Sequence, residues 1–308
     1  MKVLITGGAG FIGSHLARHW RSKHKIVIFD NLTSGLRKNI QDISCQLIQG
    51  DVRDVALLQK ACRDCDLVVH LAALINAADS ILKADEYLDV NIKGTFNVLQ
   101  VAKQCEVKKV IFASSAAVYG DHSANPKNES MLPQPISPYA ISKLTGENLC
   151  ALYHQHFHLE TVALRFFNIY GLGQRLNSSY APVIPHFVES ALQGRPLTIY
   201  GDGLQTRDFI CIDDVMDAID LVVPSRVDGV FNVGSGNATS IVELARKVIQ
   251  TCNTNAVIQH QPARAGDVLH SQADITKIRG LGFRPKSPLE SKLIQLRHSF
   301  SDALSITQ

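Results

Sequence analysis

The sequence predicts a doubly wound α/β fold, in which helices cover both faces of a parallel sheet, with a smaller C-terminal lobe. Short apolar runs alternate with helix-like segments through the first half of the chain, and this order is typical of such sheets. The first run, residues 2–6, leads directly into a glycine-rich turn at residues 7–13. The length of 308 residues suffices for one large domain or for two lobes.

The predicted strands of the sheet are apolar runs at residues 2–6, 25–29, 46–49, 67–70, 109–112 and 161–164. Such continuous runs are typical of strands that are buried on both faces. Around residue 170 the chain becomes rich in glycine and proline, which predicts where the smaller lobe begins. We expect a first domain over residues 1–168 and a substrate-binding lobe over residues 169–308, with residues 207–236 able to rejoin the first domain. The last eight or so residues are expected to form a loose tail.

The turn after the first strand has the spacing of a dinucleotide-binding motif. Gly8, Gly10 and Gly13 fit G-x-G-x-x-G, and Gly7, Gly10 and Gly13 fit the variant G-x-x-G-x-x-G. Glycines let the backbone approach a pyrophosphate closely, and the N-terminus of the following helix favours its negative charge. The sequence therefore predicts a Rossmann sheet with a dinucleotide at this turn.

The second strand ends in Asp30, which follows Gly10 by 20 residues. A carboxylate at this position can accept both ribose hydroxyls of adenosine, and it repels a 2′-phosphate. The next residue is Asn31 rather than an arginine, so NAD is favoured over NADP.

Composition argues against several classes of protein. Basic and acidic residues number 31 and 28, and no basic cluster suggests nucleic acid or an anionic membrane. We expect no signal peptide, and the apolar runs of the chain are shorter than the ~20 residues of a membrane span. The seven cysteines are scattered, as is typical of a reducing cytoplasm, and Cys62 and Cys65 lack further ligands for a zinc site. We expect a cytoplasmic protein without a metal.

Tyr139 and Lys143 form a candidate catalytic pair. A spacing of four places both side chains on one face of a helix. An ammonium group held there favours the phenolate, which lowers the pKa of the tyrosine from ~10 towards the range of a general base. The alternative for the pair alone is a solvated helix face.

Four patterns now stand in one order: residues 6–13, His70-Leu71-Ala72-Ala73, Ser114-Ser115 with Tyr119-Gly120, and Tyr139 with Lys143. Together they resemble the extended short-chain dehydrogenase/reductase family, specifically its NAD-dependent nucleotide-sugar epimerase/dehydratase branch. The resemblance continues through residues 164–171, 201–209 and 264–267, and so covers essentially the whole chain.

The resemblance implies the roles of the catalytic residues. Tyr139 takes the proton from a sugar hydroxyl while a hydride passes to NAD. Lys143 holds the nicotinamide ribose and lowers the pKa of the tyrosine, and Ser115 positions or relays the hydroxyl proton. The residues implied to bind the cofactor are Gly7, Gly10, Phe11, Ile12, Gly13, Asp30, Asn31, Asp51, Val52, Leu71, Ala72, Ala73, Asn91, Ser114, Tyr139, Lys143 and Phe166.

The resemblance also implies a site for a UDP-sugar. Its implied residues are Ser115, Tyr139, Asn168, Leu197, Tyr200, Arg207, Arg264, Asp267 and Ser271. Arg207, Arg264 and Asn168 would hold the diphosphate, and Tyr200 would stack on uracil. A small residue such as Ser271 leaves room for a 2-acetamido group, where a tyrosine would restrict the pocket to plain hexoses.

The residues after Ser115 narrow the reaction. Dehydratases and decarboxylases of this branch carry an acidic residue before the Tyr-Gly, whereas this chain has Ala116 and Ala117. We therefore expect a UDP-sugar 4-epimerase that accepts UDP-GlcNAc and UDP-GalNAc, UDP-Glc and UDP-Gal, or both pairs. The alternatives are a UDP-glucuronate 4-epimerase or another enzyme of the branch and, in a different class, a non-catalytic NAD-binding scaffold or sensor.

Two helix-like segments, about residues 86–105 and 139–157, resemble those that form a four-helix dimer interface in this family. A homodimer is expected from this resemblance alone, since any helix of such a fold carries a mixed face.

Overall fold

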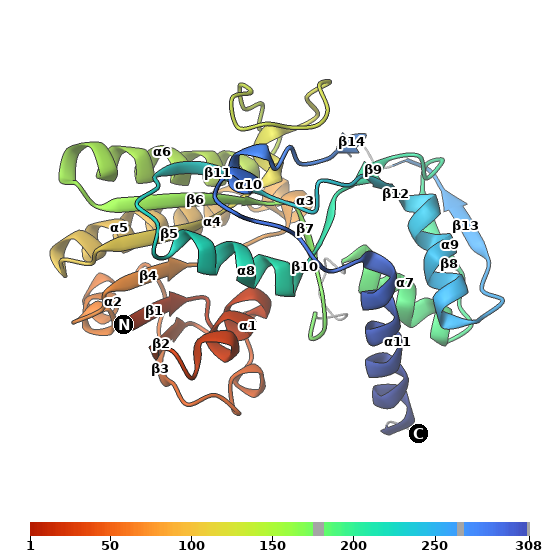
Figure 1. Ribbon diagram of the computed structural model, residues 1–308, viewed down its shortest axis with the longest axis horizontal. Helices are drawn as coiled ribbons and strands as arrows, with labels where there is room; N and C mark the ends of the chain where they lie inside the picture. The colour runs from red at the N-terminus through yellow and green to blue at the C-terminus, as the bar shows by residue number, and fades with distance from the viewer. Residues whose placement is uncertain (175–181, 264–267, 307–308) are drawn as a thin grey trace. The chain divides into compact units, whose positions relative to one another are not determined.

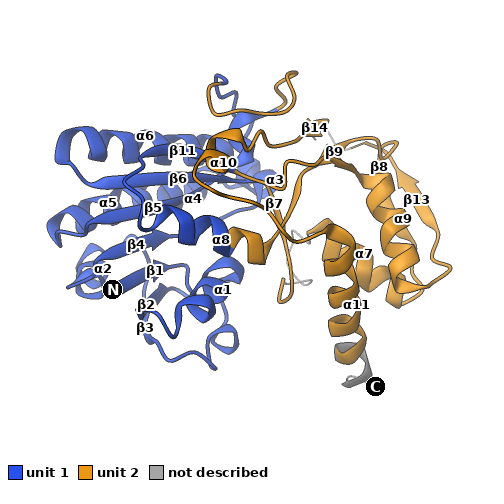
Figure 2. Ribbon diagram, viewed as in Figure 1, with its two compact units in different colours: residues 1–120, 131–166, 216–232 blue, residues 121–130, 167–215, 233–308 orange. Residues whose placement is uncertain are grey.

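The computed structural model describes residues 1–174, 182–263 and 268–306, and it divides into two compact units. Unit 1 comprises residues 1–120, 131–166 and 216–232, and unit 2 comprises residues 121–130, 167–215 and 233–308 (Figure 2). The chain passes between the two units at several points, whereas the sequence predicted one main boundary at residue 168. The binding roles expected of the two parts stay predictions.

Unit 1 is built on a seven-stranded sheet in the order β11-β6-β5-β4-β1-β2-β3 (Figure 1). Its strands are β1 (Lys2–Thr6), β2 (Lys25–Asp30), β3 (Gln46–Gln49), β4 (Leu67–His70), β5 (Lys109–Ser115), β6 (Glu160–Phe166) and β11 (Gly229–Val233). The pairings from β3 across to β6 are all parallel. Chain order reverses between β1 and β4, and ligands of doubly wound sheets bind at such a reversal.

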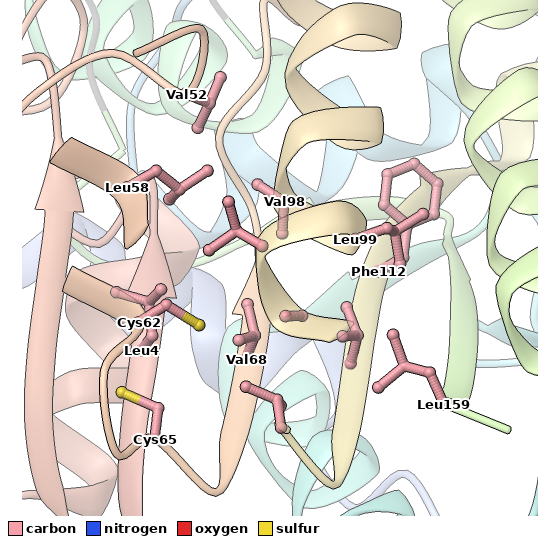
Figure 3. Packing of buried hydrophobic residues seen from close by; sticks show 14 of the residues in the cluster. Leu4, Val52, Leu58, Cys62, Cys65, Val68, Val98, Leu99, Phe112 and Leu159 are labelled. Carbon is pink, nitrogen blue, oxygen red and sulfur yellow. The ribbon is translucent and has the colours of Figure 1, made fainter. Parts of the chain in front are cut away.

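Helices cover this sheet on both faces. They are α1 (Phe11–Trp20), α2 (Val55–Cys62), α3 (Ala77–Leu82), α4 (Ala84–Leu88), a π-helical turn η2 (Asp89–Lys93), α5 (Gly94–Gln104), α6 (Pro138–Phe157), α8 (Ile212–Val222) and the short turns η1 (Arg37–Asn39) and η3 (Ala116–Tyr119). On one face Leu58 of α2 and Leu99 of α5 pack against Leu4, Val68 and Phe112 of the strands (Figure 3). The other face of β1 is also fully buried, because α1 lies against it.

Unit 2 consists of small sheets and a layer of helices. The strand pairs are β7 (Asn168–Tyr170) with β10 (Phe209–Cys211) and β8 (Leu197–Tyr200) with β13 (Ile258–Gln261), and a third sheet joins β12 (Thr239–Ser240), β9 (Thr206–Arg207) and β14 (His270–Ser271). The helices are α7 (Val183–Leu192), α9 (Ile241–Cys252), α10 (Thr276–Gly280) and α11 (Leu289–Ile306).

The C-terminus differs from the expectation of a loose tail. Helix α11 continues to Ile306, because it packs against α7 and α9, so the expectation is wrong for residues 301–306. Among the described residues, no helix is long and apolar enough to cross a membrane.

Candidate active site

The glycine turn lies at the carboxyl end of β1, beside the end of β4. Gly7 has a φ of +71°, and a Cβ there would lie 2.7 Å from the backbone nitrogen of Ala72. A Cβ on Gly13 would collide with the carbonyl oxygen of Gly7, so both positions require glycine. The backbone of Leu71 and Ala72 thus lies beside the glycine turn, and the expectation that Leu71, Ala72 and Ala73 line the cofactor stays a prediction.

The first turn of α1 offers backbone donors to an anion. The helix begins at Phe11 after Gly10, and no side chain in the described part of the structure caps it. The N–H groups of Phe11, Ile12 and Gly13 belong to the first turn, which has no carbonyl of its own helix to bind. A pyrophosphate fits these donors and the positive end of the helix dipole.

Asp30 presents a carboxylate suited to a ribose. Its Oδ2 accepts the N–H of Ala9 at 2.9 Å, and its Oδ1 accepts the N–H of Leu32 at 2.8 Å. Each oxygen keeps lone-pair capacity for one more donor, so two ribose hydroxyls can be bound. These features fit NAD, and the glycines and Asp30 are the residues that would hold it.

Asn31 and Asp51 also come together, at the ends of β2 and β3. Asn31 Nδ2 donates to Asp51 at 3.1 Å, and Arg53 donates from Nε and Nη2 at 2.8 and 2.9 Å. The Arg53 guanidinium holds the pKa of Asp51 well below its usual range, so this carboxylate remains an acceptor at neutral pH. Val52, the next residue, is buried. The backbone N–H of Arg53 also donates to Asp51 Oδ1 at 3.0 Å, so each carboxylate oxygen already accepts two donors, and the adenine contact of Asp51 stays a prediction.

The catalytic pair lies on the first two turns of α6, whose N-terminus is capped by Ser137. Lys143 is 4% exposed, and its Nζ donates to the carbonyl of Ala113 at 2.8 Å. The same Nζ lies 5.9 Å from the ring centroid of Tyr139, so the shared face is confirmed and the solvated alternative is wrong for Lys143. Burial lowers the pKa of Lys143 to about 8. The protonated amine favours the phenolate of Tyr139.

Ser115 is the last residue of β5, and its hydroxyl oxygen accepts the N–H of Ala117 at 3.1 Å. This bond orients the side chain and leaves the hydroxyl proton for another acceptor. Ser114 precedes it on the same strand, and Phe166 is buried at the end of the neighbouring strand β6. Successive side chains of a strand point to opposite faces, so Ser114 and Ser115 have separate partners.

A buried ion pair under the catalytic helix was missed by the sequence reasoning. Glu147 follows Lys143 by one turn of α6 and accepts from Arg165 Nε at 2.8 Å and Nη2 at 2.7 Å. The hydroxyl of Ser114 donates to the same carboxylate, and the guanidinium lies 4.7 Å from the ring centroid of Tyr119. The pair therefore joins α6 to β5, β6 and η3. Its one signal in the sequence is the helical spacing of Tyr139, Lys143 and Glu147.

In unit 2 the predicted diphosphate residues gather on short strands. Arg207 of β9 is in register with Ser271 of β14, and Asn168 of β7 pairs with Phe209 two residues after Arg207. Asn168 also donates its backbone N–H to the carbonyl of Asp208 at 3.0 Å. The structure thus brings Arg207, Asn168 and Ser271 to one region of the unit.

Asp208 holds these strands in place, and the sequence did not lead us to predict this role. Its side chain is fully buried and accepts backbone N–H groups of Ser235 at 2.7 Å, Gly236 at 2.9 Å and Ala273 at 3.1 Å. Burial raises the pKa of this carboxyl, although these hydrogen bonds oppose the rise. Asp208 therefore ties the strand of Arg207 to two loops of unit 2.

The predicted uracil residues lie on a separate sheet. Leu197 is buried and Tyr200 is 36% exposed, on opposite ends of β8. Gln205 donates to the carbonyl of Tyr200 at 2.8 Å and so connects β8 with the turn before β9. Arg264 and Asp267 lie outside the described residues.

Cys62 and Cys65 belong to the hydrophobic core of unit 1. Both are buried, and burial raises the pKa of Cys65 to about 11 (Figure 3). Within the described ranges, no three histidine, cysteine or acidic side chains are grouped to hold a metal ion.

Comparison with known proteins identifies the family of this chain. The model of the NAD dependent epimerase/dehydratase family matches residues 3–234. The chain belongs to this family. The family is one of enzymes, so this chain is an enzyme, and its cofactor is NAD.

Individual relatives are similar along nearly the whole chain. A putative UDP-glucose 4-epimerase of Methanocaldococcus jannaschii is 35% identical over 94% of both chains. A UDP-N-acetyl-alpha-D-glucosaminuronate decarboxylase of Bacillus cytotoxicus is 34% identical over 95% of both. The structure of a UDP-N-acetylglucosamine 4-epimerase from Methanobrevibacter ruminantium M1, in complex with UDP-N-acetylmuramic acid, has a TM-score of 0.93 at 37% identity, covering 99% of this chain and 98% of that one.

Proposed function

We propose that this protein is an NAD-dependent UDP-sugar 4-epimerase. The observation that carries the proposal is the pairing of Tyr139 and buried Lys143 on α6 with a stretch after Ser115 that has no acid. Ala116 and Ala117 begin η3 and can neither donate nor accept a proton through their side chains. Glu147, the nearest acid along α6, is occupied by Arg165 and Ser114. An oxidation that is reversed at the same carbon needs no further acid.

The chain's own residues supply the proton transfers. Tyr139 accepts the proton of the sugar 4-hydroxyl and returns it after the keto-sugar has presented its other face. Lys143 stabilises the phenolate before the first transfer and again after the second, and Ser115 donates a hydrogen bond to the reacting oxygen. The glycine turn and Asp30 would hold NAD, which would supply an acceptor for the C4 hydride and a donor for its return.

Residues of unit 2 are the basis for the sugar substrates that we propose. Arg207 supplies a planar charged fork for the diphosphate, and Asn168 supplies an amide beside it. Ser271, in register with Arg207, is small enough to leave room for a 2-acetamido group. We propose that UDP-GlcNAc and UDP-GalNAc are accepted as well as UDP-Glc and UDP-Gal.

The rival within the family is a decarboxylase or dehydratase, and a UDP-glucuronate 4-epimerase is a further alternative. The experiment is incubation of the purified protein with these four UDP-sugars and UDP-glucuronate, with chromatographic separation and mass measurement of the products. C4 epimers of UDP-GlcNAc, UDP-GalNAc, UDP-Glc or UDP-Gal at unchanged mass support the proposal, whereas epimerisation of UDP-glucuronate alone would support the alternative. Loss of water or of CO₂ would replace it with a rival.

Tyr139→Phe separates an enzyme from a scaffold that only binds NAD. The change removes the base and leaves the ring, so turnover should fall by at least ~10²-fold while the NAD content of the protein is retained. Undiminished turnover in this variant would exclude Tyr139 as the base.

A homodimer through α5 and α6 is part of the proposal. The ring of Phe96 on α5 lies 6.5 Å from Tyr153 on α6, which lies 5.1 Å from Phe157. Phe96, Ile141, Leu152 and Phe157 are 41–45% exposed, and apolar side chains gathered in this way favour a contact with a second copy. Sedimentation velocity of Phe96→Glu tests it, with monomer expected. We also propose a cytoplasmic location, since all seven cysteines are free thiols.

A further inference from the structure

A chain of buried polar side chains in unit 1 connects the ends of β1 and β4 with α5. Thr6 Oγ1 lies 2.7 Å from His70 Nδ1, and His70 Nε2 lies 3.0 Å from Thr95 Oγ1. The hydroxyl of Thr95 donates in turn to the backbone carbonyl of Asn91. These four residues are 0–3% exposed, so each polar atom of the chain depends on its protein partner.

Donor and acceptor roles are fixed along this chain. Because Thr95 gives its proton to Asn91, its oxygen accepts the Nε2–H of His70. His70 Nδ1 then accepts the hydroxyl proton of Thr6, whose oxygen accepts the N–H of Ala72 at 3.4 Å. Only the neutral Nε2–H tautomer satisfies both threonines, since an imidazolium would leave the Thr6 proton without this acceptor.

The chain continues to the catalytic helix through the side chain of Asn91. Asn91 exchanges two hydrogen bonds with the backbone of Leu74, at 2.8 and 2.9 Å, and donates to Ser142 Oγ at 3.0 Å. Ser142 donates to the carbonyl of Tyr139 at 2.7 Å. Asn91 lies in the π-helical turn η2, a local irregularity that is frequent at functional sites.

We propose that His70 is a positioning residue for the reaction, and that it acts through Thr95 and Asn91 to hold the first turns of α6. These contacts fix the position of the end of β1, which precedes the glycine turn, relative to helix α6, which carries Tyr139 and Lys143. Neither residue 70 nor residue 95 touches the reacting atoms. The expected change in kcat rests on the proposed function, whereas the expected change in the stability of the first turns of α6 does not.

Thr95→Val tests the proposal against a matched control, Thr161→Val. Both threonines are 2% exposed, and Thr161 donates to the carbonyl of Cys150 in the last turns of the same helix α6. Each change removes one buried hydroxyl, so both should lower Tm. Well below Tm, Thr95→Val should lower kcat by at least about tenfold with KM for the UDP-sugar almost unchanged, because the reacting groups are misplaced. Thr161→Val should keep the kcat of the wild type.

Amide hydrogen exchange gives a readout that does not need turnover. Exchange at residues 139–146 should be faster in Thr95→Val than in Thr161→Val, since only the former loses the hydrogen bond to Asn91. This arm decides the inference even if no UDP-sugar is turned over, which would be a failure of the proposed function alone. Equal exchange in the two variants, or equal kcat in an active enzyme, would overturn the proposal.

The tautomer of His70 provides a second independent test. Burial, with the nearby charge of Lys143 acting in the same direction, lowers the pKa of His70 to about 3. In ¹⁵N-histidine NMR spectra, the signal that disappears in His70→Gln should belong to an Nε2–H tautomer and should not titrate between about pH 5 and 8. An Nδ1–H tautomer, or titration in this range, would contradict the assignment.

Discussion

Glu147→Gln removes the charge from the buried ion pair and keeps the size of the side chain. Both members of the pair are 4% exposed at the side chain, and Arg165 donates to the two carboxylate oxygens at 2.8 and 2.7 Å. A glutamine offers one acceptor oxygen and turns an NH₂ group towards a guanidinium that cannot lose its proton. Neutralising one partner of a buried pair costs about 3–5 kcal/mol, so we expect the free energy of unfolding to fall by this amount.

The assay is urea unfolding followed by the fluorescence of Trp20, the one tryptophan of the sequence, which is fully buried in unit 1. Lys83→Gln is the control, because Lys83 and Asp79 form an ion pair in the same unit with side chains that are 56% and 29% exposed. It should change stability by at most about 1 kcal/mol. Replacing both Glu147 and Arg165 with methionine should recover part of the loss. A cost for Glu147→Gln as small as that of the control would refute the reasoning.

Three further substitutions test named contacts. Burial lowers the pKa of Lys143 from 10.5 to about 8, so its charge costs stability below the lowered pKa and the cost fades as the pH rises towards 10.5. Lys143→Met should therefore abolish turnover yet raise Tm near about pH 7, with a smaller gain at about pH 9; a lower Tm at the first pH would contradict this. Asp208→Asn should weaken UDP binding in calorimetry without changing NAD content. The amide NH₂ of the asparagine would face the backbone N–H groups that now donate to Asp208, and the resulting shift of the strand would displace Arg207. Unchanged UDP affinity would argue against this role. Gly13→Ala should lower the NAD content of the purified protein, whereas Gly280→Ala, whose Cβ would meet nothing within 4 Å, should not; equal NAD contents would show that the turn tolerates a Cβ.

Local patterns were sufficient for the sheet and the catalytic pair. Tyr139 and Lys143 are one turn apart, and helix geometry alone places them on one face. Asp30 could be placed as well, since the strand that ends in it begins only a short helix after the glycine turn. In each of these cases the contact depends on a single element or on two that are adjacent along the chain.

The supporting contacts could not be predicted, because they depend on strand register. Ser114 and Arg165 reach the same carboxylate because β5 and β6 pair with these two residues opposite each other. His70 meets Thr6 for the same reason, across the register of β1 and β4. A shift of one residue would turn each side chain to the other face of the sheet. Register is fixed by packing of the whole sheet, which no short motif contains.

Two buried networks, the pair of Glu147 with Arg165 and the chain of His70 with its threonines, determine which charges act near Lys143. Glu147 lies one helical turn from Lys143, and an unpaired carboxylate there would offset the charge of the amine and raise the pKa of Tyr139. The bidentate contact with Arg165 occupies that carboxylate on the far side of the turn. His70, held neutral by its two threonines, adds no positive charge near Lys143. The ammonium group is therefore left to act on Tyr139, which is what a phenolate base at neutral pH requires.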